Sequence, residues 1–247
     1  MELSDYFYAH PKAALAFSGG VDSAYLLYEA VRNGADVRPY FLKTAFQPAF
    51  ELSDAQRFAD ALGVRLTVVE RDILRCREVA ENPPDRCYHC KKALFGTLRE
   101  QSLKDGYALL TDGTNASDDA DDRPGMRALR ELDVASPLRE CGLTKDEIRR
   151  RSASAGLFTA SKPAYACLAT RIPTGTPLTS DALRRVENAE SALFRLGFTD
   201  FRVRVFHNAA RIQLPSGQWD AAPSQRADIL AALKPYFEIV LLDLETR

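Results

Sequence analysis

A glycine pair near the N-terminus lies between a short apolar run and an amphipathic stretch. Residues 13–17 have the length and composition of a buried strand, and residues 22–33 repeat apolar side chains with helical spacing. Residues 18–23 (SGGVDS) join the two. Two glycines let the backbone turn tightly, while the serine hydroxyls and the N–H groups that open the next helix can point at one spot. The sequence therefore predicts a strand–loop–helix unit that cradles a pyrophosphate group.

The same alternation continues over the first two thirds of the chain. Strand-like runs are predicted at 37–42, 64–69 and 107–110, and helices at 54–62, 89–103 and 144–155. The last of these helices begins with Thr144 as its N-cap and Glu147 completing a capping box. Strands that alternate with helices indicate an α/β fold with a parallel sheet covered on both faces.

The pattern changes after residue 160. Residues 161–179 are rich in Pro, Thr and Ala with little periodicity, which indicates a linker or an active-site loop. A small α+β unit is then predicted, with helices at 180–196 and 224–233 and strands at 201–206, 210–214 and 237–242. We therefore expect a nucleotide-binding domain at 1–160, a loop at 161–179 and a small α+β domain at 180–247.

Composition narrows the function classes. The 247 residues carry 33 Lys+Arg against 34 Asp+Glu, so the basic excess typical of nucleic-acid-binding proteins is missing. No window approaches the roughly 18 apolar residues of a membrane span, and no basic n-region followed by an apolar stretch opens the chain. Five cysteines are too few for a disulfide scaffold. We expect a cytoplasmic homo-oligomer that binds a small molecule rather than membrane or nucleic acid.

Three of the cysteines are candidates for chemistry. Cys87 and Cys90 form a CxxC motif, which alone is compatible with zinc, redox or iron–sulfur roles. The motif opens a helix after the third strand, and Cys167 follows a later strand, so a parallel sheet would bring all three thiols to one edge. Three thiolates suit a [4Fe–4S] cluster with one open iron. Cys76 and Cys141 are interpreted as structural.

Cys167 has a cation on each side in the sequence. Lys162 and Arg171 flank it, and neighbouring cations lower the pKa of a thiol and create a nucleophile or a metal ligand. A buried, inert cysteine is the alternative.

Other phosphate-binding motifs are missing. A Walker A loop needs a Gly-Lys dipeptide, and neither that dipeptide nor a G-x-G-x-x-G fingerprint occurs, which disfavours common kinases, GTPases and dehydrogenases. Residues 112–115 (DGTN) follow another predicted strand and would share the sheet edge where ligands bind in open α/β folds. A simple turn would use the same residue types.

The SGGVDS loop resembles the signature of the PP-loop ATP pyrophosphatase superfamily. The resemblance implies that ATP is cleaved between its α and β phosphates, with AMP transferred to a substrate and Asp22 near Mg²⁺. The candidate ATP-binding residues are Ser18, Gly19, Gly20, Val21, Asp22, Ser23, Asp112 and Thr114.

Within that superfamily the chain resembles the LarE family of ATP-dependent sulfur transferases. The matching stretches are RCYHCKKALF at 86–95, DGTN at 112–115, RPGMRALRELDVASPL at 123–138, GLTKDEIR at 142–149 and KPAYACLATRIPTG at 162–175. The family activates a carboxylate of a pyridinium mononucleotide as its acyl-adenylate and then replaces oxygen by sulfur, on the way to a nickel-pincer cofactor. The resemblance implies the same reaction here.

The cysteines bear on how sulfur is delivered. In one branch of the family the residue matching Cys167 gives up its own sulfur and becomes dehydroalanine, and in the other a cluster carries an extra sulfide. The CxxC together with Cys167 favours the cluster, with Cys87, Cys90 and Cys167 as its ligands and Cys167 as the catalytic residue. Sacrifice of Cys167 stays open, as do tRNA thiolation, an ammonia-dependent synthetase and a non-enzymatic ATP sensor.

Two arginines in the C-terminal part are candidates for anion binding. Arg202 and Arg204 lie two apart in a predicted strand, which puts both guanidinium groups on the face opposite Val203. Two adjacent forks suit a phosphate or a carboxylate, although a solvated strand face would alternate in the same way. The family resemblance implies that they orient the nucleotide substrate, with Glu190 as a partner and Arg171 in the same site.

Overall fold

The structure is a computed structural model that describes residues 1–118 and 124–247. Its internal contacts divide the chain into two compact units. Unit 1 comprises residues 1–79 and 85–162, and unit 2 comprises residues 80–84 and 163–247. The first residue of the 123–138 match, Arg123, lies outside the described residues. None of the described helices is long and apolar enough to cross a bilayer.

Unit 1 contains a four-stranded sheet in which every strand pair is parallel, as predicted. The strands are β1 (Lys12–Ala16), β2 (Asp36–Lys43), β3 (Thr67–Glu70) and β4 (Leu110–Thr111), in the order β3-β2-β1-β4. The chain moves outward from β1 to β3 and then returns to the other side of β1. The C-terminal ends of β1 and β4 therefore form a topological switch point, where open α/β sheets bind ligands.

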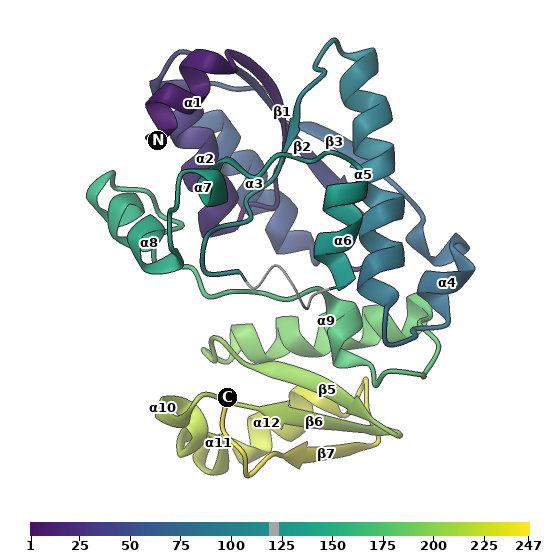
Figure 1. The fold of residues 1–247 in the computed structure, drawn as a ribbon. Coiled ribbons are helices and arrows are strands. Elements are labelled where there is room, and N and C mark those ends of the chain that lie inside the picture. The colour runs from purple at the N-terminus through teal and green to yellow at the C-terminus, as the bar shows by residue number, and fades with distance from the viewer. Residues whose placement is uncertain (119–123) are drawn as a thin grey trace. The chain divides into compact units, whose positions relative to one another are not determined.

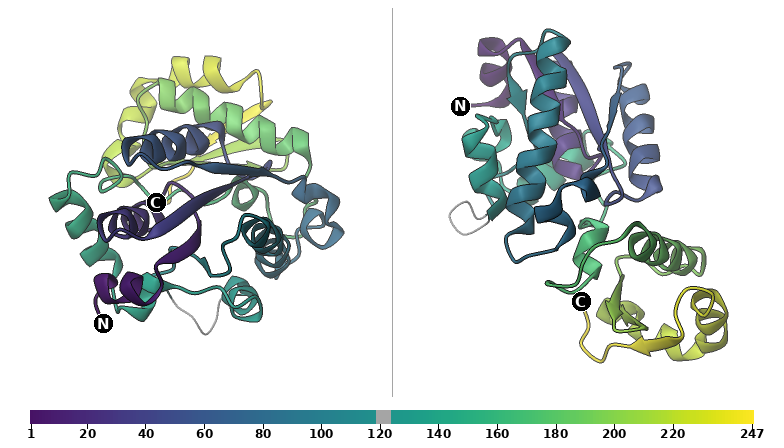
Figure 2. Two further views of the ribbon diagram at one scale, coloured as in Figure 1. Left: turned by 90° about the horizontal axis from the view of Figure 1, so that it is seen from above. Right: turned by 90° about the vertical axis from the view of Figure 1, so that its right-hand side faces the viewer.

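Helices cover both faces of this sheet, because the side chains of β1 alternate between two cores. Ala13 and Leu15 pack with α2 and α3, whereas Ala14 packs with Leu98 of α5 on the opposite face. Figures 1 and 2 show these two layers. The helical elements of unit 1 are α1 (Leu3–Ala9), α2 (Val21–Arg32), α3 (Ala49–Ala61), η1 (Ile73–Arg75), α4 (Arg77–Ala80, which ends in unit 2), α5 (Arg86–Lys104), α6 (Pro124–Glu131), α7 (Pro137–Glu140) and α8 (Lys145–Ser154).

Unit 2 is a small α+β unit, as predicted. Its strands are β5 (Arg202–Phe206), β6 (Ala209–Gln213) and β7 (Ile239–Leu242); β5 and β6 are antiparallel, and β6 and β7 are parallel. The buried side of α9 packs against β5 and α12. The helical elements are η2 (Leu168–Arg171), α9 (Ser180–Arg195), α10 (Ser216–Trp219), α11 (Ala221–Ser224) and α12 (Arg226–Leu233).

Some local predictions differ from the structure. Short elements such as α1 and α7 were not predicted, because four to seven residues hold too few turns to show a helical period. The capping box predicted for α8 is half right. The Thr144 hydroxyl accepts from the Glu147 N–H at 3.4 Å, but the Glu147 carboxylate binds Arg150 and Arg151 instead.

Candidate functional site

The SGGVDS loop closes on itself through its own hydroxyls. The Gly20 N–H donates to Ser18 Oγ, and the Ser18 N–H donates to Ser23 Oγ, each at 3.3 Å. Gly19 has a φ of +71°, and a Cβ there would lie 3.3 Å from atoms of Ala55, so both conformation and space favour glycine. The Val21 side chain is buried in the core, which leaves only its backbone for a ligand. The loop is therefore held in one shape by short-range contacts.

The segment after β4 packs against the start of α2. The Asp112 carboxylate accepts from the N–H and the hydroxyl of Thr114, at 3.1 and 2.6 Å, and from Ser136 Oγ at 2.7 Å. A Cβ on Gly113 would lie 2.9 Å from the backbone nitrogen of Ser23. Only glycine fits there without a shift, so residues 112–114 lie directly beside the loop. Asp112 and Thr114 shape this segment by binding each other.

The Asp22 carboxylate has two partners from other elements. Lys145 Nζ, from the first residue of α8, lies 2.5 Å from Oδ2, and Asn115 Nδ2 donates to Oδ1 at 3.3 Å. Asp22 is the candidate Mg²⁺ ligand, and a carboxylate beside phosphate oxygens is the donor type that Mg²⁺ prefers. Its oxygens can serve a metal once Lys145 moves to another anion.

A cavity of about 530 Å³ opens beside the loop, which is within the usual size range of ligand pockets. Three of its lining residues, Cys87, Lys91 and Phe95, follow one another at four-residue spacing and so share one face of α5. Lys91 is the one Lys or Arg among the described lining residues. The others are Ala16, Ser18, Asp22, Ser23, Asp112, Gly113, Thr114, Asp118, Pro124, Gly125 and Met126. The cavity thus combines an apolar wall with the predicted phosphate loop.

Both thiols of the CxxC motif lie at the start of α5, and neither is in a disulfide bond. Cys87 is exposed, and Arg86 Nη2 lies 3.7 Å from its sulfur. His89 between them pairs with Asp85 at 3.2 Å. Among the residues that the structure describes, no group of three or more His, Cys, Asp or Glu side chains is arranged to hold a metal ion. The expectation that Cys167 follows a strand of the parallel sheet is wrong, because Cys167 comes after α8 and belongs to unit 2. The three-cysteine cluster stays a prediction.

Cys167 lies in a segment that one buried carboxylate ties down on both sides. Glu190 accepts two bonds from Arg171, Nε to Oε1 at 2.8 Å and Nη2 to Oε2 at 3.3 Å, and both side chains are 1% exposed. Glu190 also accepts from the Tyr165 hydroxyl and, at 2.9 Å, from the Val203 N–H. Tyr165 before Cys167 and Arg171 after it therefore both bind the same carboxylate, Glu190 on α9.

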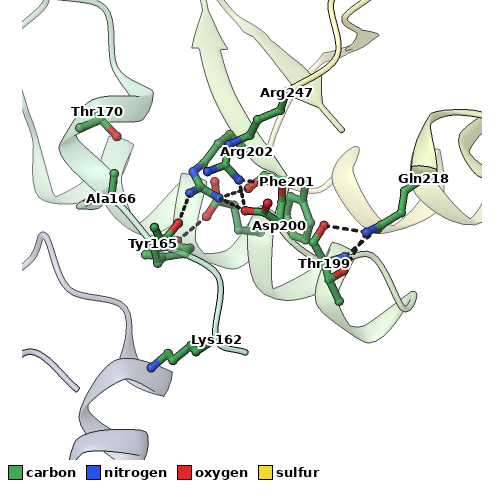
Figure 3. Close-up of polar contacts among 12 residues, drawn as sticks. Lys162, Tyr165, Ala166, Thr170, Thr199, Asp200, Phe201, Arg202, Gln218 and Arg247 are labelled. Carbon is green, nitrogen blue, oxygen red and sulfur yellow. Dashed lines mark hydrogen bonds and ion pairs between the residues drawn. The ribbon is translucent and has the colours of Figure 1, made fainter. Parts of the chain in front are cut away.

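Arg202 and Arg204 hold the backbone of the same segment. Arg202 is 4% exposed and donates to the carbonyls of Ala164 and Phe201, both at 2.6 Å (Figure 3). Arg204 Nη1 donates to the Thr170 carbonyl at 2.9 Å. This burial argues against a solvated strand face at Arg202. The sequence placed both guanidinium groups together but gave no sign that their face is covered.

Burial weakens the charged form of both arginines, although Asp200 Oδ1 lies 3.8 Å from Arg202 Nη1. Desolvation, followed by repulsion from Arg171 and Arg247, lowers the pKa of Arg202 to about 10. Burial and the neighbouring arginines also lower the pKa of Arg204. An added anion would relieve this repulsion. The arginine group is therefore chemically suited to a phosphate or a carboxylate.

The two cations that flank Cys167 in the sequence have carboxylate partners. Arg171 binds Glu190, and Lys162 Nζ, in unit 1, lies 2.8 Å from Asp54 Oδ2 and donates to the Gly19 carbonyl at 3.2 Å. Their effect on the Cys167 thiol stays a prediction. Sequence reasoning missed Lys91 and Lys145 as site residues, although both lie in the stretches that carry the family resemblance.

Comparison with known proteins gives a consistent set of relatives, although no family model matches. The chain is 38% identical over 222 residues to an uncharacterized protein of Synechocystis, covering 87% of this chain and 81% of that protein. It is 32% identical over 209 residues to the pyridinium-3,5-bisthiocarboxylic acid mononucleotide synthase of Lactiplantibacillus plantarum, covering 84% of this chain and 76% of that enzyme. It is 26% identical over 193 residues to the tRNA-specific 2-thiouridylase MnmA of Thermotoga maritima, covering 61% and 54%.

Proposed function

Because the chain belongs to the LarE family of PP-loop enzymes, we propose that it adenylates a carboxylate of a pyridinium mononucleotide and replaces one oxygen by sulfur. In general terms it is an ATP-dependent sulfur transferase. The observation that carries the finer proposal is the closed SGGVDS loop on a cavity of about 530 Å³, in a chain similar to an enzyme whose name gives that product. The reaction belongs to nickel-pincer nucleotide biosynthesis.

ATP would bind at the switch point of unit 1. The N–H groups that open α2 and the hydroxyls of Ser18 and Ser23 would be the donors for its phosphates, because the Ser18 and Gly20 N–H groups already donate within the loop. Asp22 would hold Mg²⁺, which neutralises phosphate charge when bound. Lys91 would add a positive charge that the loop itself lacks. We keep 1–160 as the ATP-binding domain, 161–179 as the active-site loop and 180–247 as the substrate domain.

The chemistry has two steps. A carboxylate oxygen of the substrate attacks the α-phosphorus of ATP, the bond to the β-phosphate breaks, and pyrophosphate leaves with the negative charge. A sulfur nucleophile then attacks the acyl carbon of the adenylate, and AMP leaves. Arg202 and Arg204, with Arg171 and Glu190 beside them, orient the anionic substrate.

Cys167 handles the sulfur. Cys87, Cys90 and Cys167 are soft donors suited to an iron–sulfur cluster, and three thiolates would leave one iron free to carry sulfide. In the alternative, the Cys167 thiolate attacks the acyl carbon to give a thioester. Loss of its α-proton then breaks the Cβ–S bond, which leaves dehydroalanine on the protein and a thiocarboxylate on the substrate.

Product and metal analysis tests the proposal. ATP turnover with the pyridinium mononucleotide carboxylate should give AMP and pyrophosphate, and formation of ADP and phosphate would contradict the proposal. Anaerobic purification followed by iron, sulfide and zinc analysis tests the cluster. Mass spectrometry after turnover should find Cys167 intact, whereas a loss of about 34 Da, the mass of H₂S, would favour sacrifice of its sulfur.

Two alternatives have their own tests. The similarity to MnmA makes tRNA thiolation the main one, and a net charge of −1 speaks against it. Thiolated tRNA after incubation with ATP and a sulfur source would support it. An ammonia-dependent synthetase would form an amide and give Cys167 no role. The cytoplasmic location and the homo-oligomer stay predictions.

A further inference from the structure

Lys162 lies at the junction of the two units. It is the last residue of unit 1, and Pro163 begins the segment that reaches Cys167 five positions after Lys162. The Lys162 side chain is 15% exposed, and its ammonium group lies between the Asp54 carboxylate at 2.8 Å and the carbonyl of Gly19 at 3.2 Å. The junction therefore contacts the SGGVDS loop directly.

Arg149 holds the backbone of the same junction. Its Nη1 donates to the Ala160 carbonyl at 2.6 Å, and its Nη2 donates to the Lys162 carbonyl at 3.0 Å. Arg149 lies four residues after Lys145 on α8, so the two side chains share a helix face. Lys145 is the residue that pairs with Asp22 of the loop. One face of α8 thus contacts both the loop and the junction.

These contacts form a closed path within unit 1. It runs from Asp22 through Lys145 and Arg149 to the Lys162 carbonyl, and from the Lys162 ammonium back to Gly19. The backbone from Lys162 to Pro163 is restricted, because proline fixes its own φ and limits the conformations of the residue before it. A change at the loop can therefore redirect the chain that leads to Cys167.

We propose that Lys162 and Arg149 are positioning residues that couple nucleotide binding at the SGGVDS loop to the placement of the Cys167 segment. The inference rests on the proposed function, since it takes the loop to be the ATP site. Phosphates bound at the loop would compete with Asp22 for Lys145, and a metal ion would compete with Lys145 for Asp22. Opening of this ion pair would shift the contacts of Arg149 and Lys162. Sulfur delivery then follows adenylation instead of preceding it.

The test measures alkylation of Cys167 with and without nucleotide. The full chain, purified anaerobically, is treated with iodoacetamide in the presence or absence of Mg²⁺ and an ATP analogue with a methylene bridge between the α and β phosphates. Peptide mass spectrometry then gives the rate at Cys167 separately from the other cysteines. The variants are Lys162→Met and Arg149→Met, and Arg150→Met is the control, because Arg150 follows Arg149 on α8 and binds only Glu147 among the contacts above.

In the wild type and in Arg150→Met, we expect the analogue to change the Cys167 rate, in either direction, by about fivefold or more, the lower end of allosteric coupling. In Lys162→Met and Arg149→Met the ratio should fall to about one while the analogue still binds. If Lys162 and Arg149 had a purely structural role, their substitution would change the alkylation rate of Cys167 equally with and without the analogue.

Three outcomes would overturn the inference. Variants that keep the wild-type ratio would exclude Lys162 and Arg149 as the link. A wild-type chain that binds the analogue with no change at Cys167 would exclude coupling but leave the proposed function intact. A wild-type chain that does not bind the analogue at all would refute both.

Discussion

The two candidate sites are built from contacts of very different range. In the loop of unit 1, Ser18, Gly20 and Ser23 satisfy one another across two to five positions of sequence. Around Cys167 in unit 2, Glu190 reaches Val203 across 13 positions and Arg171 across 19, and Arg202 reaches Ala164 across 38. A locally closed loop can change its ligands without loss of the fold, whereas the unit 2 network is part of the fold. Variants in unit 1 should therefore affect chemistry, and variants in unit 2 should affect stability first.

The largest expected effect comes from breaking the buried ion pair of unit 2. Glu190→Leu leaves the Arg171 guanidinium buried without its carboxylate, which should destabilise unit 2 by about 3–5 kcal/mol. Urea unfolding followed by fluorescence can report this, since the single tryptophan, Trp219, lies in unit 2 and donates to the Asp243 carbonyl at 2.9 Å. Asp181→Asn on the same helix is the control, because the Asp181 side chain is 94% exposed.

A double variant separates the charge from the packing. Arg171→Met with Glu190→Leu removes both charges, so it should be less destabilised than Glu190→Leu alone. Equal stability of Glu190→Leu and the wild type would mean that the network around Cys167 is not part of the fold, and the contrast between the two units would be lost.

The next effect is expected at Asp22 in unit 1. Asp22→Asn removes the negative charge that would hold Mg²⁺ but keeps the side-chain shape, so pyrophosphate release should fall by about 100- to 1,000-fold. Thermal unfolding should change little, because the Asp22 and Lys145 side chains form a partly exposed ion pair and are 22% and 30% exposed. Asp60→Asn is the control within unit 1, because Asp60 is exposed on α3 and accepts from Gln56. Full turnover of Asp22→Asn would remove Asp22 from the metal site.

The same contrast explains what the sequence could predict. The loop, the parallel sheet and the helix that begins at the CxxC motif depend on neighbouring residues and on periodicity. Their types and order were predicted, and their bounds agree to within a few residues. The pairing of Arg171 with Glu190 depends on how η2 packs on α9, which no spacing encodes. Glu190 was expected to partner Arg202 and Arg204. It lies in that group but binds Arg171, while the two strand arginines bind carbonyls of the cysteine segment.

A moderate effect is expected from Arg204, which contacts the backbone of the Cys167 segment and is also a proposed substrate-binding residue. Arg204→Ala should weaken binding of the mononucleotide by about ten- to a hundredfold, the worth of a charge-assisted hydrogen bond, and leave ATP affinity unchanged. Equilibrium dialysis with each ligand measures both. Arg184→Ala is the control, since the Arg184 side chain is 69% exposed on α9. Equal loss of both affinities would indicate that Arg204 supports the fold and not the substrate.

The smallest effect is expected at the surface of unit 1, where Glu147 pairs with neighbouring arginines of α8 in contact with solvent. Hydrogen bonds from Arg150 and Arg151 lower the pKa of Glu147 from 4.5 to about 2. A carboxyl with a depressed pKa in the folded state stabilises it above the unfolded pKa, so this contribution should be lost as the pH falls from 4.5 towards 2. Titration of the Glu147 carboxyl by NMR should give the low pKa, and Glu147→Gln should lose less stability than the wild type over that pH range. Because the Glu147 side chain is partly exposed, 1 M salt, with a Debye length of about 3 Å, should remove most of the difference. A difference that survives high salt would mean that unit 1 also depends on a charge network shielded from solvent, as unit 2 does at Glu190.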